Sequence, residues 1–211
     1  MYKLLTTAVT TVAFGKLMYD IISTIYNRLH QKDDKEPVDK VIFFPDDTVS
    51  CRKYRNGICK DVNCRMSHDN TSFSQLITIF EQAKRSIDVC VFVITCQELA
   101  NVLAEKQKRG LTVRIITDSE QEDCSGSQLY KFRAAGVRVR TDRTTFFMHH
   151  KFAIVDNSLL VNGSFNWTKQ AVTGNFENLL ITSNKGIIQQ YQQEFNRLWE
   201  KFDPGKNLKN L

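Results

Sequence analysis

A histidine and a lysine two residues apart, His149 and Lys151, are the side chains of this sequence best suited to chemistry on an anionic group. Imidazole gains and loses a proton near neutral pH, so His149 can act as a nucleophile or as an acid, and Lys151 is a fixed cation. In an extended chain, residues two apart point to the same side, so both would face one site. Ser164 and Asn166 follow with hydrogen-bond donors. Together these side chains would clamp an oxyanion such as a phosphoryl group.

Two short strands joined by a turn would hold these groups in place. The apolar run 152–155 predicts a buried strand, and a second strand begins at Leu159. Between them lies Asp156, which we count among the catalytic residues and which either pairs with a lysine or fixes the turn. Glu177 follows after a loop, and its carboxylate could hold the far nitrogen of His149 and set the imidazole tautomer.

The spacing His-x-Lys-x4-Asp-x6-Gly-Ser-x-Asn resembles the HKD signature of the phospholipase D superfamily. The matching residues are His149, Lys151, Asp156, Gly163, Ser164 and Asn166. Glu177 lies where the family places its downstream acid. A second pair, His30 and Lys32, has Pro37 in place of the aspartate and no Gly-Ser-x-Asn after it, so we interpret it as linker. The alternative for 149–166, an ordinary core hairpin with a satisfied histidine, does not account for the glycine, serine and asparagine.

The resemblance implies a mechanism that uses two histidines. One attacks phosphorus and forms a phosphohistidine, and the other protonates the leaving oxygen and then activates water. In-line displacement requires them on opposite sides of the phosphorus. Because this chain has one complete copy of the motif, the resemblance implies a homodimer with a composite active site, in which two His149 residues meet across a twofold axis. It implies no catalytic metal, since lysines and asparagines neutralise the transferred group.

Length and composition indicate one globular domain with appendages. The chain has 211 residues, of which 42% are hydrophobic and 25% charged, as is ordinary for a globular protein. A formal net charge of +6 suits an anionic partner, either nucleic acid or a membrane surface. The six cysteines show no secretory disulfide framework, and three of them fall within 51–64. We therefore expect a reducing compartment and a metal site.

That metal site would consist of Cys51, Cys59, Cys64 and His68, spaced Cys-x7-Cys-x4-Cys-x3-His. Three thiolates and one imidazole complete a tetrahedral zinc shell, and a closed shell is structural. The spacing resembles CCCH zinc fingers, many of which bind single-stranded RNA. The interleaved candidates for RNA contact are Arg52, Lys53, Tyr54, Arg55, Lys60 and Arg65. The alternative is a zinc staple with no ligand-binding role.

Further arginines precede the catalytic stretch, at Arg138, Arg140 and Arg143. They would form either a basic wall beside the scissile phosphate, which would help to hold RNA, or a solvated strand edge. At the amino terminus, the apolar stretch 4–26 is interrupted by Lys16 and Asp20. We interpret residues 1–27 as a marginal membrane anchor, the alternatives being a mitochondrial presequence and an amphipathic helix. A charged linker follows over 28–37.

Strands alternate with helices through the remaining domain, residues 38–202, which precede a tail over 203–211. A capping box at Ser72–Gln75 predicts the start of the first helix. Hydrophobic periodicity then predicts strand 87–95, helix 98–109, strand 111–117, helix 127–135, strand 137–140, strand 179–182 and helix 187–202. The fold class is therefore α/β. The resemblance implies a phospholipase D-like sandwich, a mixed β-sheet with helices on both faces. This sequence adds the small zinc-binding insertion 51–68, which domains of the family usually lack, and the hydrophobic amino-terminal segment.

The combination of a hydrophobic amino terminus, a CCCH cluster and one HKD copy resembles mitochondrial members of the superfamily. This implies a metal-independent, single-strand-specific endoribonuclease of piRNA biogenesis, on the mitochondrial outer membrane and facing the cytosol, leaving 5′-phosphate ends. The same family also implies an alternative, a cardiolipin hydrolase that releases phosphatidate. A catalytically silent membrane scaffold is the third possibility. Cleft shape discriminates, because one nucleic-acid strand needs a polar basic groove, whereas acyl chains need an apolar slot.

Overall fold

The structure is a computed structural model that describes residues 15–24, 37–55 and 57–207. The chain divides into two compact units, Met1–Glu36 and Pro37–Leu211. Within the first unit, residues 15–24 form a helix whose side chains are almost all exposed. Of the helices described, none combines the length and the apolar character needed to cross a membrane. Most of the anchor expected over 1–27, and nearly all of the linker expected over 28–37, lie outside the described residues.

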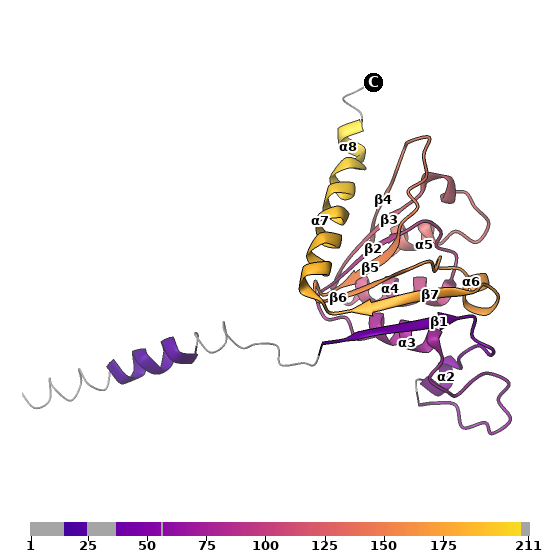
Figure 1. Ribbon diagram of the computed structural model, residues 1–211, viewed down its shortest axis with the longest axis horizontal. Helices are drawn as coiled ribbons and strands as arrows, with labels where there is room; N and C mark the ends of the chain where they lie inside the picture. Colours follow the sequence, from indigo (N-terminus) through magenta and orange to yellow (C-terminus); the bar gives the residue numbers. More distant parts are fainter. Residues whose placement is uncertain (1–14, 25–36, 56, 208–211) are drawn as a thin grey trace, which may run out of the picture. The chain divides into compact units, whose positions relative to one another are not determined.

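The second unit is built on a seven-stranded sheet (Figure 1). Its strands are β1 (Asp39–Phe44), β2 (Ser86–Val91), β3 (Thr112–Thr117), β4 (Arg138–Thr141), β5 (Lys151–Val155), β6 (Leu159–Gly163) and β7 (Glu177–Thr182). The spatial order is β1-β7-β6-β5-β2-β3-β4. The pairs β2–β3 and β3–β4 are parallel and the other neighbours are antiparallel. The predicted mixed sheet is therefore confirmed.

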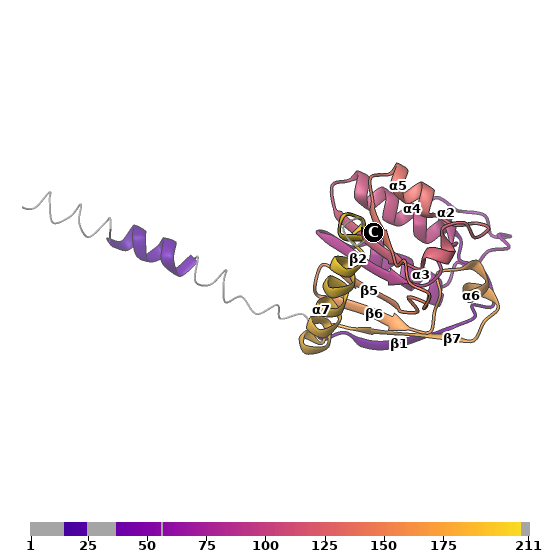
Figure 2. The ribbon, with the colours of Figure 1, turned by 90° about the horizontal axis from the view of Figure 1, so that it is seen from above.

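Helices cover both faces of this sheet (Figures 1 and 2). They are α2 (Arg52–Arg55), α3 (Ser72–Glu81), α4 (Gln97–Lys108), α5 (Leu129–Ala134), α6 (Lys169–Thr173), α7 (Lys185–Lys201) and α8 (Pro204–Asn207), with a 3-10 turn at Ser119–Gln121. One buried cluster unites α3, α4 and α5 with one face of the sheet, and a second unites α7 with the other face. Alternate residues of β2 show the division, since Val89 belongs to the first cluster and Cys90 to the second.

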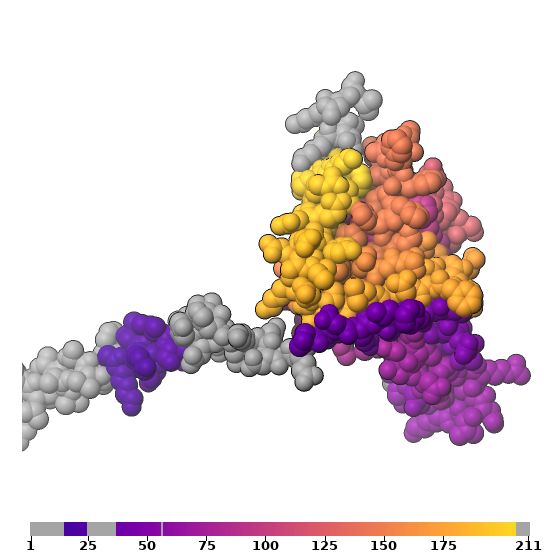
Figure 3. Space-filling model, viewed as in Figure 1, coloured from indigo at the N-terminus to yellow at the C-terminus, as the bar shows by residue number. Residues whose placement is uncertain are grey.

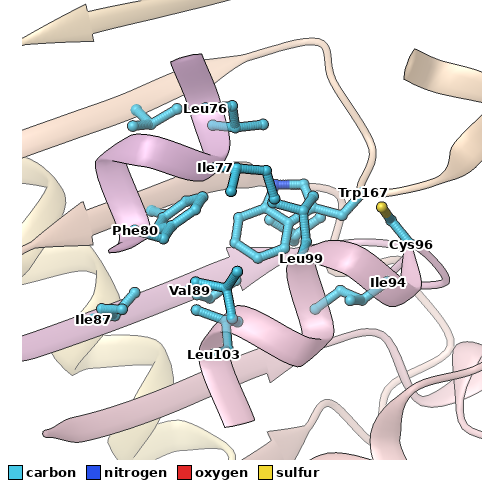
Figure 4. Close-up of a cluster of buried hydrophobic side chains, with 14 of the residues drawn as sticks. Leu76, Ile77, Phe80, Ile87, Val89, Ile94, Cys96, Leu99, Leu103 and Trp167 are labelled. Atoms are coloured by element: carbon cyan, nitrogen blue, oxygen red, sulfur yellow. The ribbon is translucent and has the colours of Figure 1, made fainter. Parts of the chain in front are cut away.

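Trp167 lies at the centre of the larger cluster, between α3 and α4 (Figure 4). Its ring packs on Phe80 with the centroids 5.1 Å apart. Its backbone bonds the segment that follows β2: its N–H donates to Val93 (3.0 Å), and its carbonyl accepts from Thr95 (2.9 Å) and Cys96 (2.7 Å). Because Trp167 directly follows Asn166, this packing anchors the end of the HKD motif.

Two sequence predictions about element ends were wrong. Strand β2 ends at Val91 instead of residue 95, because the residues beyond Phe92 leave β5 and bond Trp167, whose N–H donates to the Val93 carbonyl (3.0 Å). Helix α3 is capped by Thr71, whose hydroxyl accepts from the N–H of Ser74 (3.1 Å), rather than by a box that starts at residue 72. Short helices α2, α6 and α8 were not predicted, because each is too short for a periodic pattern to identify it, and α8 lies in the segment expected to be a tail.

Candidate active site

His149 and Lys151 lie together at the start of β5, where Lys151 pairs with Val91 at the end of β2. The Lys151 ammonium is 3.2 Å from Nε2 and 3.3 Å from Nδ1 of the His149 ring, and it donates to the His149 carbonyl at 3.0 Å. The imidazole is exposed and packs against Phe92, with the ring centroids 4.9 Å apart. A nucleophile and a cation therefore face one open site, as the spacing predicted.

The charge of Lys151 is set by two opposing effects. Burial lowers the pKa of its amine from the ordinary lysine value, and the negative charge of Glu177 acts in the opposite sense. The carboxylate therefore helps to keep a partly desolvated lysine in the cationic form that a phosphoryl group requires.

Glu177, the first residue of β7, binds Ser164 and Asn175. The Ser164 hydroxyl donates to Oε2, and the Asn175 amide donates to Oε1 at 3.0 Å. The Ser164 hydroxyl in turn accepts from the N–H of Asn178 at 3.2 Å. We expected Glu177 to hold the His149 imidazole, but the described contacts of its carboxylate are with these other residues. Glu177 thus positions the serine and supports the charge of Lys151.

Gly163 is required where β6 meets β7. A Cβ atom at this position would lie 2.0 Å from the carbonyl oxygen of Asn178, far inside van der Waals contact. The N–H of Ser164 donates to the same carbonyl at 3.1 Å. Without a side chain at 163, the two strands approach closely enough for Ser164 to reach Glu177. The glycine of the motif is therefore a packing requirement that serves the hydroxyl next to it.

Asn166 supplies an amide with unused hydrogen-bonding capacity. Its Oδ1 is buried and has no hydrogen-bond partner. A buried amide oxygen without a partner is costly, so such atoms mark places where a ligand completes the bonding. Because an amide can turn over, it can also present its NH₂ group to a phosphoryl oxygen.

Asp156 lies at the opposite end of β5 from His149 and Lys151. It adopts a left-handed φ of 54°, and its carboxylate accepts from the backbone N–H groups of Lys84 (2.9 Å), Arg85 (2.6 Å) and Ser86 (3.0 Å). Burial alone would raise its pKa, but these bonds and the Arg85 charge lower it overall. The ionised Asp156 carboxylate therefore adds to the free energy of unfolding at pH values above the ordinary carboxyl pKa. This contribution is lost as the pH falls through the lowered pKa of the folded protein. Asp156 therefore fixes the start of β2 and does not reach the site, so its catalytic assignment is corrected.

A hollow of about 450 Å³ adjoins His149, between the loop 142–150 and α7. Its apolar lining residues are Phe146, Phe147, Met148, Leu198 and Phe202. Charged groups of α7 line it as well, Arg197 and Lys201 among them. His150 spans the gap, with Nε2 3.6 Å from the carboxylate of Glu194. The Arg197 guanidinium is paired with Glu194 at 2.7 Å, so the space beside the nucleophile combines an apolar wall with charges of both signs.

Comparison with known proteins agrees with this geometry. Residues 76–199 match the family model described as "Cardiolipin synthase, PLD-like domain". The chain is 46% identical over 169 residues to a mitochondrial cardiolipin hydrolase of Chlamydomonas reinhardtii (80% of this chain, 76% of that protein). It is 42% identical over 170 residues to one of Xenopus tropicalis (81% and 80%). The chain belongs to the phospholipase D superfamily.

Solved structures show the same fold. The phospholipase D family member Nuc from Salmonella typhimurium superposes with a TM-score of 0.63 at 24% identity, over 78% of this chain and 95% of that one. NucT from Helicobacter pylori gives 0.59 at 21%, over 78% and 97%. This chain is a phosphodiester-cleaving hydrolase of the phospholipase D superfamily.

Two buried aspartates that the sequence reading missed hold the loop before His149. Asp118, which follows β3, accepts from the N–H of Met148 at 2.8 Å. Asp142, which follows β4, accepts from the N–H of Ser119 (3.0 Å) and the hydroxyl of Thr144 (3.0 Å). Parallel strands bring their carboxyl ends to one edge of a sheet, so acids directly after β3 and β4 were the signal that could have revealed them.

The expected basic wall does not form as one surface. The Arg140 guanidinium donates to the Trp199 carbonyl and to Asp203 (3.0 Å), and it lies over the Trp199 ring 4.3 Å from the centroid. Arg138, at the other end of β4 from the loop, lies 5.9 Å from the same centroid. Arg143 is exposed on the loop itself. Arg140 is thus a structural residue that fastens β4 to α7.

The predicted metal ligands lie together. The ligand atoms of Cys51, Cys59, Cys64 and His68 are all within 4.8 Å of one another, the one such group among the described residues. Nε2 of His68 is buried without a hydrogen-bond partner, and the ring stacks on Tyr54 with the centroids 4.1 Å apart. The donor set fits a zinc ion. Of the neighbouring cations, Arg55 pairs with Glu81 at 3.5 Å instead of facing solvent, whereas Arg52, Lys53, Lys60 and Arg65 are exposed.

Proposed function

We propose that this protein hydrolyses phosphodiesters through a phosphohistidine on His149. Nε2 of His149 attacks phosphorus, and the oxygen–phosphorus bond to the leaving alcohol breaks as a second histidine donates a proton to that oxygen. The second histidine then takes a proton from water, which attacks phosphorus and releases the phosphomonoester together with free His149. Lys151 and Asn166 bind the non-bridging oxygens, and Ser164, positioned by Glu177, completes the donors.

The second histidine would be His149 of another copy of this chain. Within the described residues, His150 is the nearest other imidazole in sequence, but its Nε2 lies 3.6 Å from the Glu194 carboxylate and the residue lines the hollow beside α7. A twofold axis through the open site would place two His149 residues on opposite sides of one phosphorus atom. The exposure of His149 leaves room for such a partner.

The substrate that the site supports best is a glycerophospholipid diester of the cardiolipin type. The observation that carries this proposal is the hollow beside His149, whose wall of phenylalanine, methionine and leucine offers an apolar slot for an acyl chain. The Lys201 ammonium in the same lining suits a second lipid phosphate. The relatives' name, mitochondrial cardiolipin hydrolase, agrees with this chemistry. The product would be phosphatidate, and the location would be the mitochondrial outer membrane, with the enzyme facing the cytosol.

The Phe146→Ser protein tests the slot. Phe146 lines the hollow and is 82% exposed, so the change removes apolar contact without disturbing the core. We expect cardiolipin hydrolysis in mixed micelles to fall about tenfold, the worth of one partly buried aromatic contact, while hydrolysis of a small soluble chromogenic phosphodiester stays unchanged.

Phe176→Ser is the matched control, because Phe176 is 91% exposed beside Glu177 and does not line the hollow. It should leave both activities unchanged. Equal loss on the soluble diester would show that Phe146 supports the catalytic groups instead of a lipid chain. An enzyme that cleaves single-stranded RNA but not cardiolipin would overturn the lipid assignment.

A second candidate, an endoribonuclease for single-stranded RNA in piRNA biogenesis, draws support from the Cys/His cluster. Its exposed cations, Arg52, Lys53, Lys60 and Arg65, suit a phosphate backbone, and Tyr54 is an aromatic among them. The Tyr54 ring is already stacked on His68, which leaves one face for a base. Cleavage by the same mechanism would leave 5′-phosphate and 3′-hydroxyl ends.

We expect a zinc ion to hold the Cys/His cluster together whether the substrate is a lipid or RNA. We expect one zinc ion per chain, bound by three thiolates and the His68 imidazole, with a structural role. In the Cys64→Ser protein, zinc measured by atomic emission should fall to a small fraction of one per chain. Cys124→Ser is the control, because Cys124 lies outside the cluster, and it should retain its zinc. Unchanged stoichiometric zinc after Cys64→Ser would exclude Cys64 as an essential ligand.

A further inference from the structure

The segment 57–66, which we call the Cys/His loop, carries large aliphatic side chains in full contact with solvent. Val62 is 95% exposed and Ile58 is 68% exposed. Following α2, the loop stands out from the body on the side of α3, as Figures 1 and 3 show. Single exposed apolar residues are common on protein surfaces. Two at the end of a protrusion are suited to enter an apolar environment outside the protein.

Local hydrogen bonds hold Val62 at the corner of a turn. The N–H of Cys64 donates to the carbonyl of Asp61 at 3.3 Å, and the N–H of Asn63 donates to the Asp61 carboxylate at 2.9 Å. The turn thus projects Val62 outward, and the carboxylate beside it is engaged by the backbone.

Ile58 is held outward in a similar way. It follows Gly57, whose φ of +71° is in the left-handed region, and its N–H donates to the carbonyl of Lys53 at 2.7 Å. Cys59, the next residue, donates to the same carbonyl at 3.0 Å. Cys59 directly follows Ile58, and Cys59 and Cys64 flank Val62, so the clustered cysteines tie down the loop beside each aliphatic tip. The tips themselves are exposed and contribute nothing to a core.

Cations surround these tips. The exposed basic residues of this region are Arg52, Lys53, Lys60 and Arg65. Between residues 52 and 66 the one acidic residue is Asp61. Aliphatic side chains at the end of a protrusion with lysine and arginine around them match the layered chemistry of an anionic bilayer, in which phosphates lie above hydrocarbon.

We propose that the Cys/His loop docks on an anionic lipid surface, with Ile58 and Val62 entering the acyl boundary and the cations contacting lipid phosphates. Charge complementarity points to an anionic partner, and the exposed aliphatic tips favour a bilayer over RNA, because RNA offers no apolar layer for them. This contact is separate from the amino-terminal segment and independent of which diester His149 cleaves. It would set the distance of the catalytic domain from the membrane.

The test measures the depth of the tip in the full-length chain, with His149→Ala present throughout so that lipid is not hydrolysed. Val62→Trp is compared with Tyr130→Trp, since Tyr130 is 84% exposed on α5. Each protein is reconstituted into vesicles of phosphatidylcholine and phosphatidylglycerol, with and without brominated acyl chains. After subtraction of the signal from the buried Trp167 and Trp199, the Val62→Trp protein should show a blue-shifted emission and loss of fluorescence with brominated lipid.

The Tyr130→Trp protein should show neither change. Adding Lys60→Gln and Arg65→Gln to the Val62→Trp protein, or omitting phosphatidylglycerol, should reduce the quenching, because each cation near an anionic surface strengthens binding about fivefold. Equal quenching at both positions, or none at either, would overturn the proposal. A signal at position 62 that responds to a single-stranded RNA oligonucleotide but not to brominated lipid would assign the loop to RNA and would also overturn it.

Discussion

The His149→Ala protein should lose phosphodiester hydrolysis by about 10⁴-fold or more, because the change removes the nitrogen that we propose forms the covalent bond to phosphorus. His149 lies exposed in the site with the Lys151 ammonium 3.2 Å from its ring. Its removal leaves the sheet and both buried clusters intact, so the free energy of unfolding should stay close to that of the parent. Steady-state hydrolysis of cardiolipin and of a soluble diester, beside urea unfolding, measures both quantities.

His150→Ala is the matched control for this prediction. His150 is the adjacent residue, is also exposed, and lies with Nε2 3.6 Å from the Glu194 carboxylate, outside the catalytic cluster. An exposed pair of this kind contributes little to stability, so the variant should keep most of its activity on the soluble diester. If His149→Ala remained active, or if the two variants lost activity equally, the phosphohistidine mechanism would be excluded.

Mixing parent chains with His149→Ala chains tests whether the active site is shared between two copies of the chain. After subunit exchange between equal amounts of parent and His149→Ala chains, about one quarter of the activity of the same total number of parent chains should remain, because only dimers with two intact histidines turn over. Independent sites would leave one half. The same mixture made with His150→Ala should show no loss beyond the activity of its components.

Gly163→Ala should destabilise the fold by about 3 kcal/mol and strongly reduce activity, because overpacking forces backbone to move. The added methyl would lie 2.0 Å from the Asn178 carbonyl oxygen, a backbone atom fixed between paired strands. To relieve the overlap, β6 and β7 must separate, and that movement takes Ser164 away from Glu177. The midpoint of urea unfolding and the turnover of the soluble diester should fall together.

Gly186→Ala is the control, because the methyl would meet only the Asn184 side chain at 3.4 Å. Gly186 lies near the start of α7, where alanine favours helix over glycine by up to about 1 kcal/mol. We therefore expect unchanged or slightly raised stability and full activity. A Gly163→Ala protein as stable and active as this control would show that the β6–β7 approach is not required.

Strand β5 shows most clearly how far the sequence predicted the site. The His-x-Lys spacing placed His149 and Lys151 on one open site, because alternation in an extended chain is a local property. The same spacing suggested a catalytic role for Asp156, which was wrong. Only pairing with β2, more than sixty residues earlier, brings the backbone of Lys84 to Ser86 onto that carboxylate.

Glu177 illustrates the same limit. Its place in the motif was read from the chain, but the partners of its carboxylate depend on the β6–β7 contact, which brings Ser164 to it. The surroundings of the site were also beyond the sequence. Arginines before His149 suggested a basic wall, but the packing of α7 occupies Arg140 and leaves an apolar hollow beside the loop.

The sequence by itself determined the α/β class, the HKD motif and hence the type of chemistry, and it identified the four residues of the Cys/His cluster, since these depend on residue type and short-range spacing. The tertiary structure decided which acid serves the site, why residue 163 must be glycine, how Asp118 and Asp142 hold the catalytic loop, and which surface lies next to the nucleophile. Those features depend on contacts between segments distant in the chain, and they form only when the sheet and α7 come together.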